Sequence, residues 1–218
     1  MATTLNFNVF SADQEELSNS NMPETGLLLS YGANFVKIPK DQAIFRESHL
    51  ARFYYKVESG KIKMCNYHED GKEFIQGIFE EGESFGEPPL FINAPYPADA
   101  IAVEDSVVLR LSRNHYFTML KENPDLLFQY AVYVSERLMN KAQRMRDLSS
   151  YSPELRILNL LKETKKKSHN RSPGPERINL TRQEIANMTG LRVETVIRTM
   201  KALQESGKIT IQSRKVYF

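Results

Sequence analysis

The sequence predicts an α+β chain in which a β-rich N-terminal domain is joined by a long helix to a C-terminal winged helix-turn-helix. Three observations lead to this prediction. Short β-rich runs lie between residues 33 and 111, an apolar repeat with a helical period follows, and two short helices flank a glycine within 181–206. Many short strands at regular spacing indicate an antiparallel sandwich or barrel.

Length and composition bound the class of protein. The chain has 218 residues, and it contains no apolar run near the roughly 20 residues that a membrane-spanning helix needs. The N-terminus lacks the basic start and apolar core of a signal peptide, and the lone cysteine, Cys65, excludes an internal disulfide framework. We therefore expect a cytoplasmic protein that does not bind membranes.

Charge is distributed unevenly along the chain. The formal net charge is +2, yet residues 150–218 hold fourteen Lys and Arg against six Asp and Glu, whereas residues 1–149 hold fifteen against twenty-one. A basic C-terminal part is typical of a module that binds the nucleic-acid backbone, and the acidic part is expected to have another task. A surface merely rich in solvated charge would not explain why the basic residues gather around the predicted helix pair.

The N-terminal domain is predicted from runs of β-branched and aromatic residues that turn sequences separate. A helix that ends at 27–29 is expected to pack on this domain. The predicted strands are 34–38, 43–45, 53–57, 61–66, 74–79, 101–103 and 107–111.

The hydrophobic period becomes helical after residue 112. Ser112 is a good N-cap for a helix over 114–121, and Asn123-Pro124 then begins a long helix. Residues spaced alternately four and three apart form a coiled-coil seam of about three heptads, which one lysine interrupts. The seam consists of Leu127, Ala131, Val134, Leu138, Lys141, Met145 and Leu148. It predicts either a dimerisation helix or a helix that lies on its own β-domain.

Two short helices are predicted within 181–206. Thr181 and Glu184 have the spacing of a capping box, and Gly190 can take the left-handed backbone at the end of the first helix. The second helix begins near 192–194. Its apolar residues lie three and four apart and share one face, which carries Val196, Met200 and Leu203.

The opposite face of the second helix is polar and basic. It carries Arg192, Glu194, Thr195, Arg198 and Lys201. Such a helix fits the major groove of double-stranded DNA, where arginine can bind O6 and N7 of guanine and glutamate can accept from N4 of cytosine. The alternative is a helical hairpin with a charged solvent face, since helix-turn-helix patterns have many false positives.

The segments around the helix pair complete the C-terminal domain. A hinge at 148–153 precedes another helix, a basic loop spans 165–175, and a short strand is expected at 178–180. Two further strands at 208–212 and 215–218 predict a wing. The predicted domains are 1–121 for the β-domain, 122–149 for the dimerisation helix and hinge, and 150–218 for the winged helix-turn-helix.

The segment TRQEIANMTGLRVETVIRTMKALQESGKI resembles the DNA-reading segment of the Crp/Fnr superfamily of transcription regulators. The resemblance implies that Glu194 and Arg198 read bases and that Thr181 and Gln183 contact phosphates. Arg182 stands within the same motif and is a further candidate DNA contact. The resemblance also implies a homodimer formed through the long helix, with RNA polymerase as a partner.

The recognition helix resembles one branch of the superfamily more than another. Val193 stands where the cyclic-AMP receptor has a base-reading arginine, and Val-Glu-Thr is similar to the oxygen-responsive branch. We therefore expect an inverted repeat whose half-sites contain a TGA core, with TTGA favoured.

The β-rich segment FYYKVESGKIKM…HEDGKEFIQGIFEEGESFGEPPLF resembles the cupin-like jelly roll that binds cyclic nucleotides in the same superfamily. The resemblance makes Gly86 and Glu87 candidate effector-binding residues. The arginine and hydroxyl neighbour that hold the phosphate in nucleotide binders align with Pro97 and Ala98, and Asp99 adds a negative charge. We therefore expect no binding of cyclic AMP, and the sequence names no other effector.

The sequence contains no pattern typical of an iron–sulfur cluster, a metal site or a cupin-type enzyme. An iron–sulfur cluster needs about four cysteine ligands, and the four histidines lack the spacing of a metal site. We therefore expect no metal, no cofactor, no catalytic residues and no cupin-type enzyme. The remaining alternative is a small-molecule-binding module that acts through protein partners without sequence-specific DNA binding.

Overall fold

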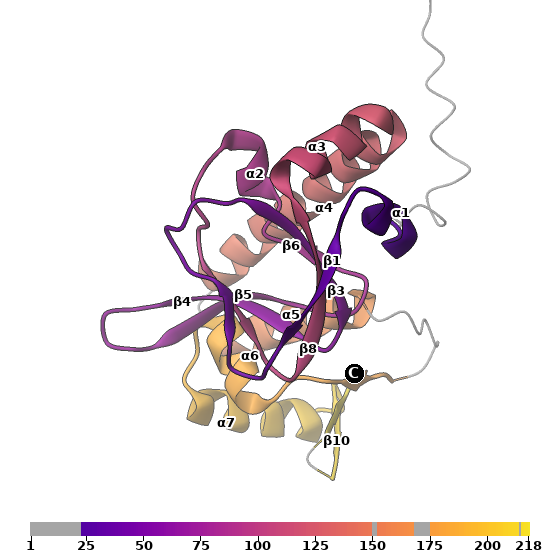
Figure 1. Cartoon of the computed structure of the whole chain (residues 1–218). Coiled ribbons are helices and arrows are strands. Elements are labelled where there is room, and N and C mark those ends of the chain that lie inside the picture. The colour runs from indigo at the N-terminus through magenta and orange to yellow at the C-terminus, as the bar shows by residue number, and fades with distance from the viewer. Residues whose placement is uncertain (1–22, 150–151, 168–174, 214) are drawn as a thin grey trace, which may run out of the picture.

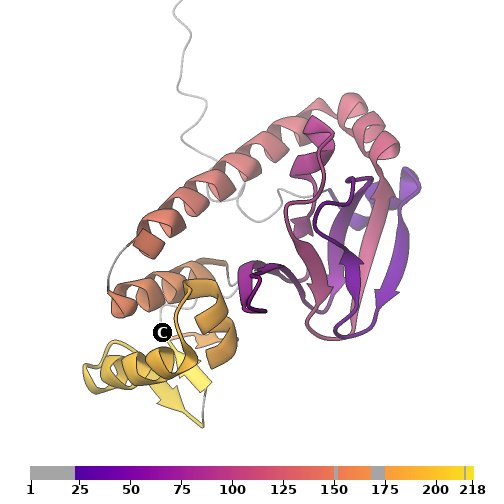
Figure 2. The ribbon, with the colours of Figure 1, turned by 90° about the vertical axis from the view of Figure 1, so that its left-hand side faces the viewer.

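The computed structural model of the chain describes residues 23–149, 152–167, 175–213 and 215–218. Figure 1 shows a β-rich domain, a long helix and a helical domain with a small sheet. In Figure 2 the long helix α4 (Pro124–Ser149) runs from the β-rich domain toward the C-terminal domain. The predicted α+β class, with a β-domain, a long helix and a winged helix-turn-helix, is confirmed.

Two four-stranded antiparallel sheets form the β-rich domain, here called the β-roll. One sheet has the strand order β1–β8–β3–β6 and the other has the order β2–β7–β4–β5. The strands are β1 (Asn34–Ile38), β2 (Ala43–Phe45), β3 (Phe53–Ser59), β4 (Ile62–Tyr67), β5 (Glu73–Phe79), β6 (Ser84–Phe85), β7 (Asp99–Ala102) and β8 (Ser106–Ser112). Because β1 pairs with β8, the first and last strands of the β-roll lie side by side.

The predicted strands are all present, with ends that differ by one or two residues. Two elements were not predicted, the strand β6 and the helix α2 (Pro88–Ile92). A strand of two residues cannot show an alternating pattern, and a helix of five residues that begins with two prolines cannot show a helical period.

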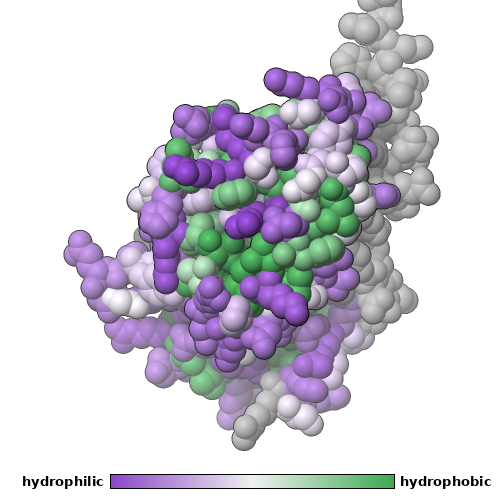
Figure 3. All heavy atoms as spheres, in the orientation of Figure 1, coloured by the Kyte–Doolittle hydropathy of each residue, from purple (hydrophilic) through white to green (hydrophobic). Residues whose placement is uncertain are grey.

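An aromatic core lies on both sides of β3. Tyr54 stacks on Tyr116 with ring centroids 4.5 Å apart, while Tyr55 stacks on Phe85 at 5.3 Å. Neighbouring residues of a strand point to opposite faces, so Tyr54 packs under the helices and Tyr55 points into the β-roll. The helices beside the β-roll are α1 (Thr25–Ser30) and α3 (Arg113–Glu122). In Figure 3 hydrophobic residues gather over the middle of this domain, with hydrophilic residues around them.

The C-terminal domain has a separate hydrophobic core. It is formed by buried residues of three helices and a small antiparallel sheet of order β10–β11–β9, among them Ile157, Leu161, Ile185, Val196, Met200 and Val216. The elements are α5 (Pro153–Lys167), β9 (Arg177–Ile178), α6 (Arg182–Thr189), α7 (Val193–Glu205), β10 (Thr210–Gln212) and β11 (Lys215–Tyr217). No helix in the described part of the chain is both long and apolar enough to cross a bilayer.

Candidate nucleic-acid interface and β-roll site

The first helix of the pair, α6, begins at a capping box. The hydroxyl of Thr181 accepts a hydrogen bond from the Glu184 amide at 3.1 Å, and the Glu184 carboxylate accepts one from the Thr181 amide at 2.7 Å. These bonds satisfy amides that lack partners within the helix and fix its first turn. Of the candidate DNA contacts here, Thr181 and Gln183 are exposed and Arg182 is half-buried.

The turn between the two helices depends on Gly190. This glycine has a φ of +67°, in the left-handed region that favours glycine, and the amide of Leu191 donates to the Ala186 carbonyl at 3.1 Å. The chain then becomes extended at Arg192, which precedes α7. Glycine therefore sets the direction in which the second helix leaves the first.

The second helix, α7, has one buried face and one polar face. Val196, Met200 and Leu203 are each at most 2% exposed and pack into the C-terminal core. On the remaining surface the candidate DNA contacts Glu194, Arg198 and Lys201 are exposed, as is Arg192, while Thr195 is half-buried. The helix therefore presents both of its candidate base readers to solvent.

The predicted wing follows α7. Strands β10 and β11 pair antiparallel with Ile211 opposite Val216, and β11 also pairs with β9. Val216 is buried in the C-terminal core, which attaches the hairpin to the helices. Lys208, before the hairpin, forms an ion pair with Glu154 of α5 at 2.6 Å. The predicted basic loop lies mostly outside the described residues.

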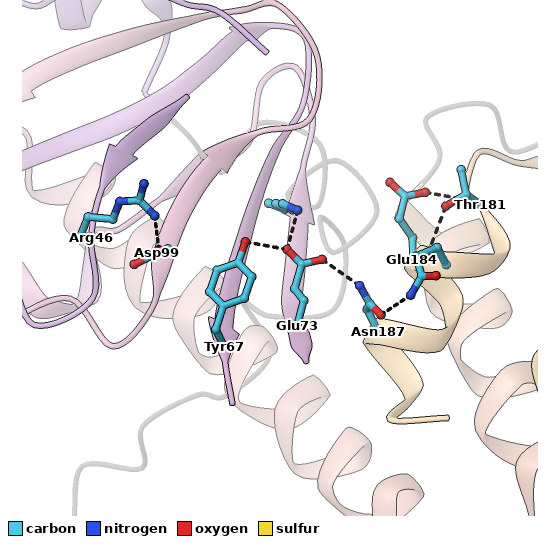
Figure 4. Close-up of polar contacts among 9 residues, drawn as sticks. Arg46, Tyr67, Glu73, Asp99, Thr181, Glu184 and Asn187 are labelled. Carbon is cyan, nitrogen blue, oxygen red and sulfur yellow. Dashed lines mark hydrogen bonds and ion pairs between the residues drawn. The ribbon is translucent and has the colours of Figure 1, made fainter. Parts of the chain in front are cut away.

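A polar network that the sequence did not predict joins α6 to the β-roll. Asn187, a buried residue, donates from Nδ2 to Oε2 of Glu73 at 2.8 Å, and Gln183 donates from Nε2 to Oδ1 of Asn187 at 2.8 Å. Figure 4 shows Glu73 of β5 and Asn187 of α6 pointing toward each other. Met188 packs beside them on an apolar cluster of Cys65, Ile75 and Ile101. A candidate phosphate contact, Gln183, is thus part of the interdomain contact.

In the β-roll, the candidate effector residue Glu87 is fully buried. Its Oε1 accepts a hydrogen bond from Nη1 of Arg137 on α4 at 2.5 Å, and its Oε2 has no hydrogen-bond partner among the described residues. Burial raises the pKa of the Glu87 carboxyl, although the Arg137 guanidinium offsets part of that shift. The sequence does not predict this partner, because Arg137 lies 50 residues from Glu87 on another element.

Aromatic rings lie against the candidate effector residue Gly86. Phe45 and Tyr96 stack with ring centroids 3.6 Å apart and planes 8° from parallel. A Cβ added at Gly86 would lie 3.0 Å from a Phe45 ring atom and 3.3 Å from a Tyr96 ring atom. The space over this glycine, whose φ is +76°, is therefore filled by the side chains of the protein itself.

The Asp99 carboxylate forms an ion pair with Arg46. Asp99 accepts from Nη1 of Arg46 at 2.7 Å and from the Glu47 amide at 2.7 Å. Within the described residues no group of three or more His, Cys, Asp and Glu side chains could hold a metal ion. Burial raises the pKa of the Cys65 thiol to about 11, so this buried cysteine stays protonated near neutral pH.

These features define a helix-turn-helix protein with a β-roll at its N-terminus. Residues 35–123 match the family model of the cyclic nucleotide-binding domain, and residues 155–218 match that of the Crp-like helix-turn-helix domain. The cyclic AMP receptor protein of Thermus thermophilus is 31% identical over 193 residues, which cover 86% of this chain and 84% of that protein. The cAMP-activated global transcriptional regulator CRP of Pasteurella multocida is 27% identical over 185 residues, covering 83% and 87%.

Solved structures share the fold at lower identity. The c-di-GMP responsive global regulator CLP of Xanthomonas campestris has a TM-score of 0.72 at 22% identity, covering 89% of this chain and 99% of that chain. A CooA mutant of Carboxydothermus hydrogenoformans has a TM-score of 0.74 at 18% identity, covering 91% and 88%. The chain belongs to the Crp/Fnr family of transcription regulators, which combine a cyclic nucleotide-binding domain with a DNA-binding helix-turn-helix and are not enzymes.

Proposed function

We propose that this chain acts as a homodimer that binds an inverted repeat of DNA with TGA-containing half-sites, TTGA favoured, through the helix near 192–206. The observation that carries the proposal is the exposed polar face of α7, on which Glu194 and Arg198 lie one helical turn apart. Arginine can bind O6 and N7 of guanine, and glutamate can accept from N4 of cytosine.

The other candidate residues take the role of positioning the helix. Thr181, Arg182 and Gln183 lie at the N-terminal end of α6, where backbone amides and the helix dipole favour a phosphate. On α7 and just before it, Arg192, Thr195 and Lys201 flank the two base readers. Phosphate contacts of this kind fix the register of the protein on DNA without specifying its sequence.

The dimer is proposed to form along α4. Three residues of the predicted seam are large, apolar and exposed in the single chain: Leu127 at 45%, Leu138 at 66% and Met145 at 72%. Phe128 and Met139 extend the exposed apolar surface to the next face of the helix. A second copy would cover this surface, and a two-fold dimer would supply the second half-site contact. The domain division at 121/122 and 149/150 is part of this proposal.

Leu138→Asp tests the dimer, because it introduces a charge at the centre of the proposed seam. We expect a monomer in analytical ultracentrifugation, with binding to the full inverted repeat strongly weakened. Glu136→Asp is the matched control on the same helix and should remain dimeric. A Leu138→Asp protein that stays dimeric would contradict the proposed seam.

Control by cyclic AMP is not part of the proposal, although the names of two relatives include that ligand. Pro97 and Ala98 supply neither a cation nor a hydroxyl for a cyclic phosphate, and Phe45 and Tyr96 fill the space beside Gly86. We propose that any effector is a different small molecule, with Gly86 and Glu87 as its candidate contacts. RNA polymerase as a partner and a cytoplasmic location complete the proposal.

Selection of bound duplexes from a random pool by the purified protein tests the proposed function. An enriched inverted repeat is expected, and Arg198→Ala should lose about 1–3 kcal/mol of binding free energy and relax one position of the half-site. Lys215→Ala, in the predicted wing, is a control that should leave the preferred sequence unchanged. Salt-sensitive binding without any enriched sequence would favour the alternative, a module that acts through protein partners.

A further inference from the structure

Ile197 is an exposed isoleucine on the recognition helix α7. Its side chain is 54% exposed, whereas Val196, Met200 and Leu203 of the same helix are almost fully buried. The partly buried apolar residues that pack on the C-terminal core include Val193 from this helix but not Ile197. Within the described residues, Ile197 is therefore not a member of the C-terminal core.

The neighbours of Ile197 on the helix surface are charged. It lies three residues after Glu194, directly before Arg198 and four residues before Lys201. Residues three and four apart in a helix are neighbours on its surface, so Ile197 lies beside Glu194 and Lys201, and the exposed Arg198 follows it directly in the chain. A large apolar side chain thus stands among groups that are suited to polar base edges.

We infer that Ile197 is a specificity-determining residue that contacts the C5-methyl group of a thymine in each half-site. This inference rests on the proposed DNA-reading function of α7. The edges of the bases in the major groove carry hydrogen-bond donors and acceptors, and the thymine methyl is the apolar group among them. An exposed isoleucine at this position would bury apolar surface against that methyl group. A cytosine lacks the methyl group and would offer no such contact.

The side chain is suited to such a contact. Isoleucine is branched at Cβ and in a helix it strongly prefers one χ1 rotamer, so little rotamer freedom is lost when it meets a base. Glu194 and Arg198 on either side satisfy polar edges, and Ile197 adds a preference that neither of them can supply. The expected result is a requirement for thymine at one symmetric position of the repeat.

The test replaces thymine with deoxyuridine, which lacks only the C5-methyl group, at each position of the selected repeat in turn. Affinity is measured for the full-length wild-type protein, for Ile197→Ala and for Ile92→Ala. Ile92 is a matched control because it is an isoleucine that is 76% exposed on α2 of the β-roll. Circular dichroism checks that each variant is folded.

We expect the wild-type protein and Ile92→Ala to lose about fourfold in affinity per half-site when one particular thymine becomes deoxyuridine, the effect of burying one methyl-sized group. Ile197→Ala should bind the thymine and deoxyuridine duplexes equally. Equal binding by the wild-type protein at all positions, or discrimination that persists in Ile197→Ala, would overturn the inference. If either of these results is found while sequence-specific binding still depends on Arg198, the inference about Ile197 fails and the proposed function stands. If the selection enriches no sequence at all, the proposed function and the inference both fail.

Discussion

Asn187 of α6 donates a hydrogen bond from Nδ2 to Oε2 of Glu73 on β5, and the two atoms are 2.8 Å apart (Figure 4). The bond joins the DNA-binding domain to the β-roll across 114 positions of sequence. The other oxygen of Glu73 accepts from Lys63 at 2.5 Å and from the Tyr67 hydroxyl at 3.1 Å. Asn187 in turn accepts from Gln183, so one connected network links the β4–β5 hairpin to the first turn of α6.

Removing the amide of Asn187 should loosen this interdomain contact. Asn187→Ala leaves Oε2 of Glu73, whose side chain is only 15% exposed, without its donor, and loss of a hydrogen bond to a charged group costs about 1.5–3 kcal/mol. We expect faster amide hydrogen exchange in β5 and α6 and a lower free energy of unfolding. Asn179→Ala, at an exposed asparagine before α6, should change stability by less than about 0.5 kcal/mol. Unchanged exchange in Asn187→Ala would contradict the role of this bond.

The Glu73 network should also make stability depend on pH. Burial alone would raise the pKa of Glu73, but its hydrogen bonds and the charge of Lys63 outweigh burial and hold the pKa below its ordinary value. A lowered folded-state pKa gives stability that is present above the unfolded-state pKa of about 4.3 and is lost as pH falls through the folded-state value. The wild-type protein should therefore exceed Glu73→Gln in stability at pH 6–7, and urea unfolding should show this difference shrinking below pH 4.

The free energies of unfolding of the wild-type protein and Glu73→Gln could instead differ by the same amount from pH 7 to below pH 4. That result would show that the charge of Glu73 does not contribute to stability. Comparison of the two proteins at each pH removes the contribution of the other carboxylates, which titrate in both. Asn187→Ala serves as a further control, because Glu73 keeps its ion pair with Lys63 in that variant.

The features predicted from the sequence are those that local chemistry determines. The capping box of Thr181 and Glu184 and the left-handed Gly190 involve contacts within a few residues, so spacing alone identifies them. The buried face of α7 follows from helical periodicity in the same way. The types of element and the order of the domains are therefore predictable from the amino-acid sequence.

The contacts that were missed join residues far apart in sequence. Asn187 is polar and lies inside an amphipathic helix, so its pattern indicates a solvent-facing position, yet its side chain is only 8% exposed because β5 covers it. Arg137 lies on a helix whose apolar seam dominates the pattern, and its partner Glu87 is on another element. Such pairings depend on how the elements pack, which periodicity does not specify.

Breaking the Glu87–Arg137 pair should be costly. Arg137→Met leaves the fully buried Glu87 carboxylate without its cation, and loss of one partner of a buried ion pair typically costs about 3–5 kcal/mol. Replacing both residues, as Glu87→Gln with Arg137→Met, removes both charges and should recover most of that loss. Urea unfolding of the two single variants and the double variant measures the coupling.

The pH dependence of Arg137→Met has a defined sign. Burial raises the pKa of Glu87, so this carboxyl binds a proton more readily in the folded protein than in the unfolded chain. The free energy of unfolding therefore decreases as pH rises through the folded-state pKa of Glu87. Without Arg137 the pKa should rise further, and the defect of Arg137→Met should be smaller at pH 5 than at pH 8. A double variant as unstable as Arg137→Met would show instead that packing of the arginine dominates.

Gly86 and Gly71 of the β-roll have similar φ values. Alanine substitutions at these two positions therefore distinguish the cost of backbone strain from the cost of side-chain crowding. Gly86 and Gly71 have φ values of +76° and +79°, so alanine at either position adopts the left-handed region at a cost of about 1–2 kcal/mol. A Cβ at Gly71 meets nothing within 4 Å, whereas a Cβ at Gly86 meets the Phe45 and Tyr96 rings. These rings are stacked and at most 7% exposed, so they have little room to move.

Gly86→Ala should therefore be less stable than Gly71→Ala by about 1–3 kcal/mol, the usual cost of overpacking a core. Thermal and urea unfolding of both variants measures the difference. Adding the substitution Phe45→Leu to Gly86→Ala should restore part of the loss, because a smaller side chain leaves space for the new methyl group. Equal losses in the two alanine variants would mean that the rings move aside at little cost, and that the space over Gly86 can open for a ligand.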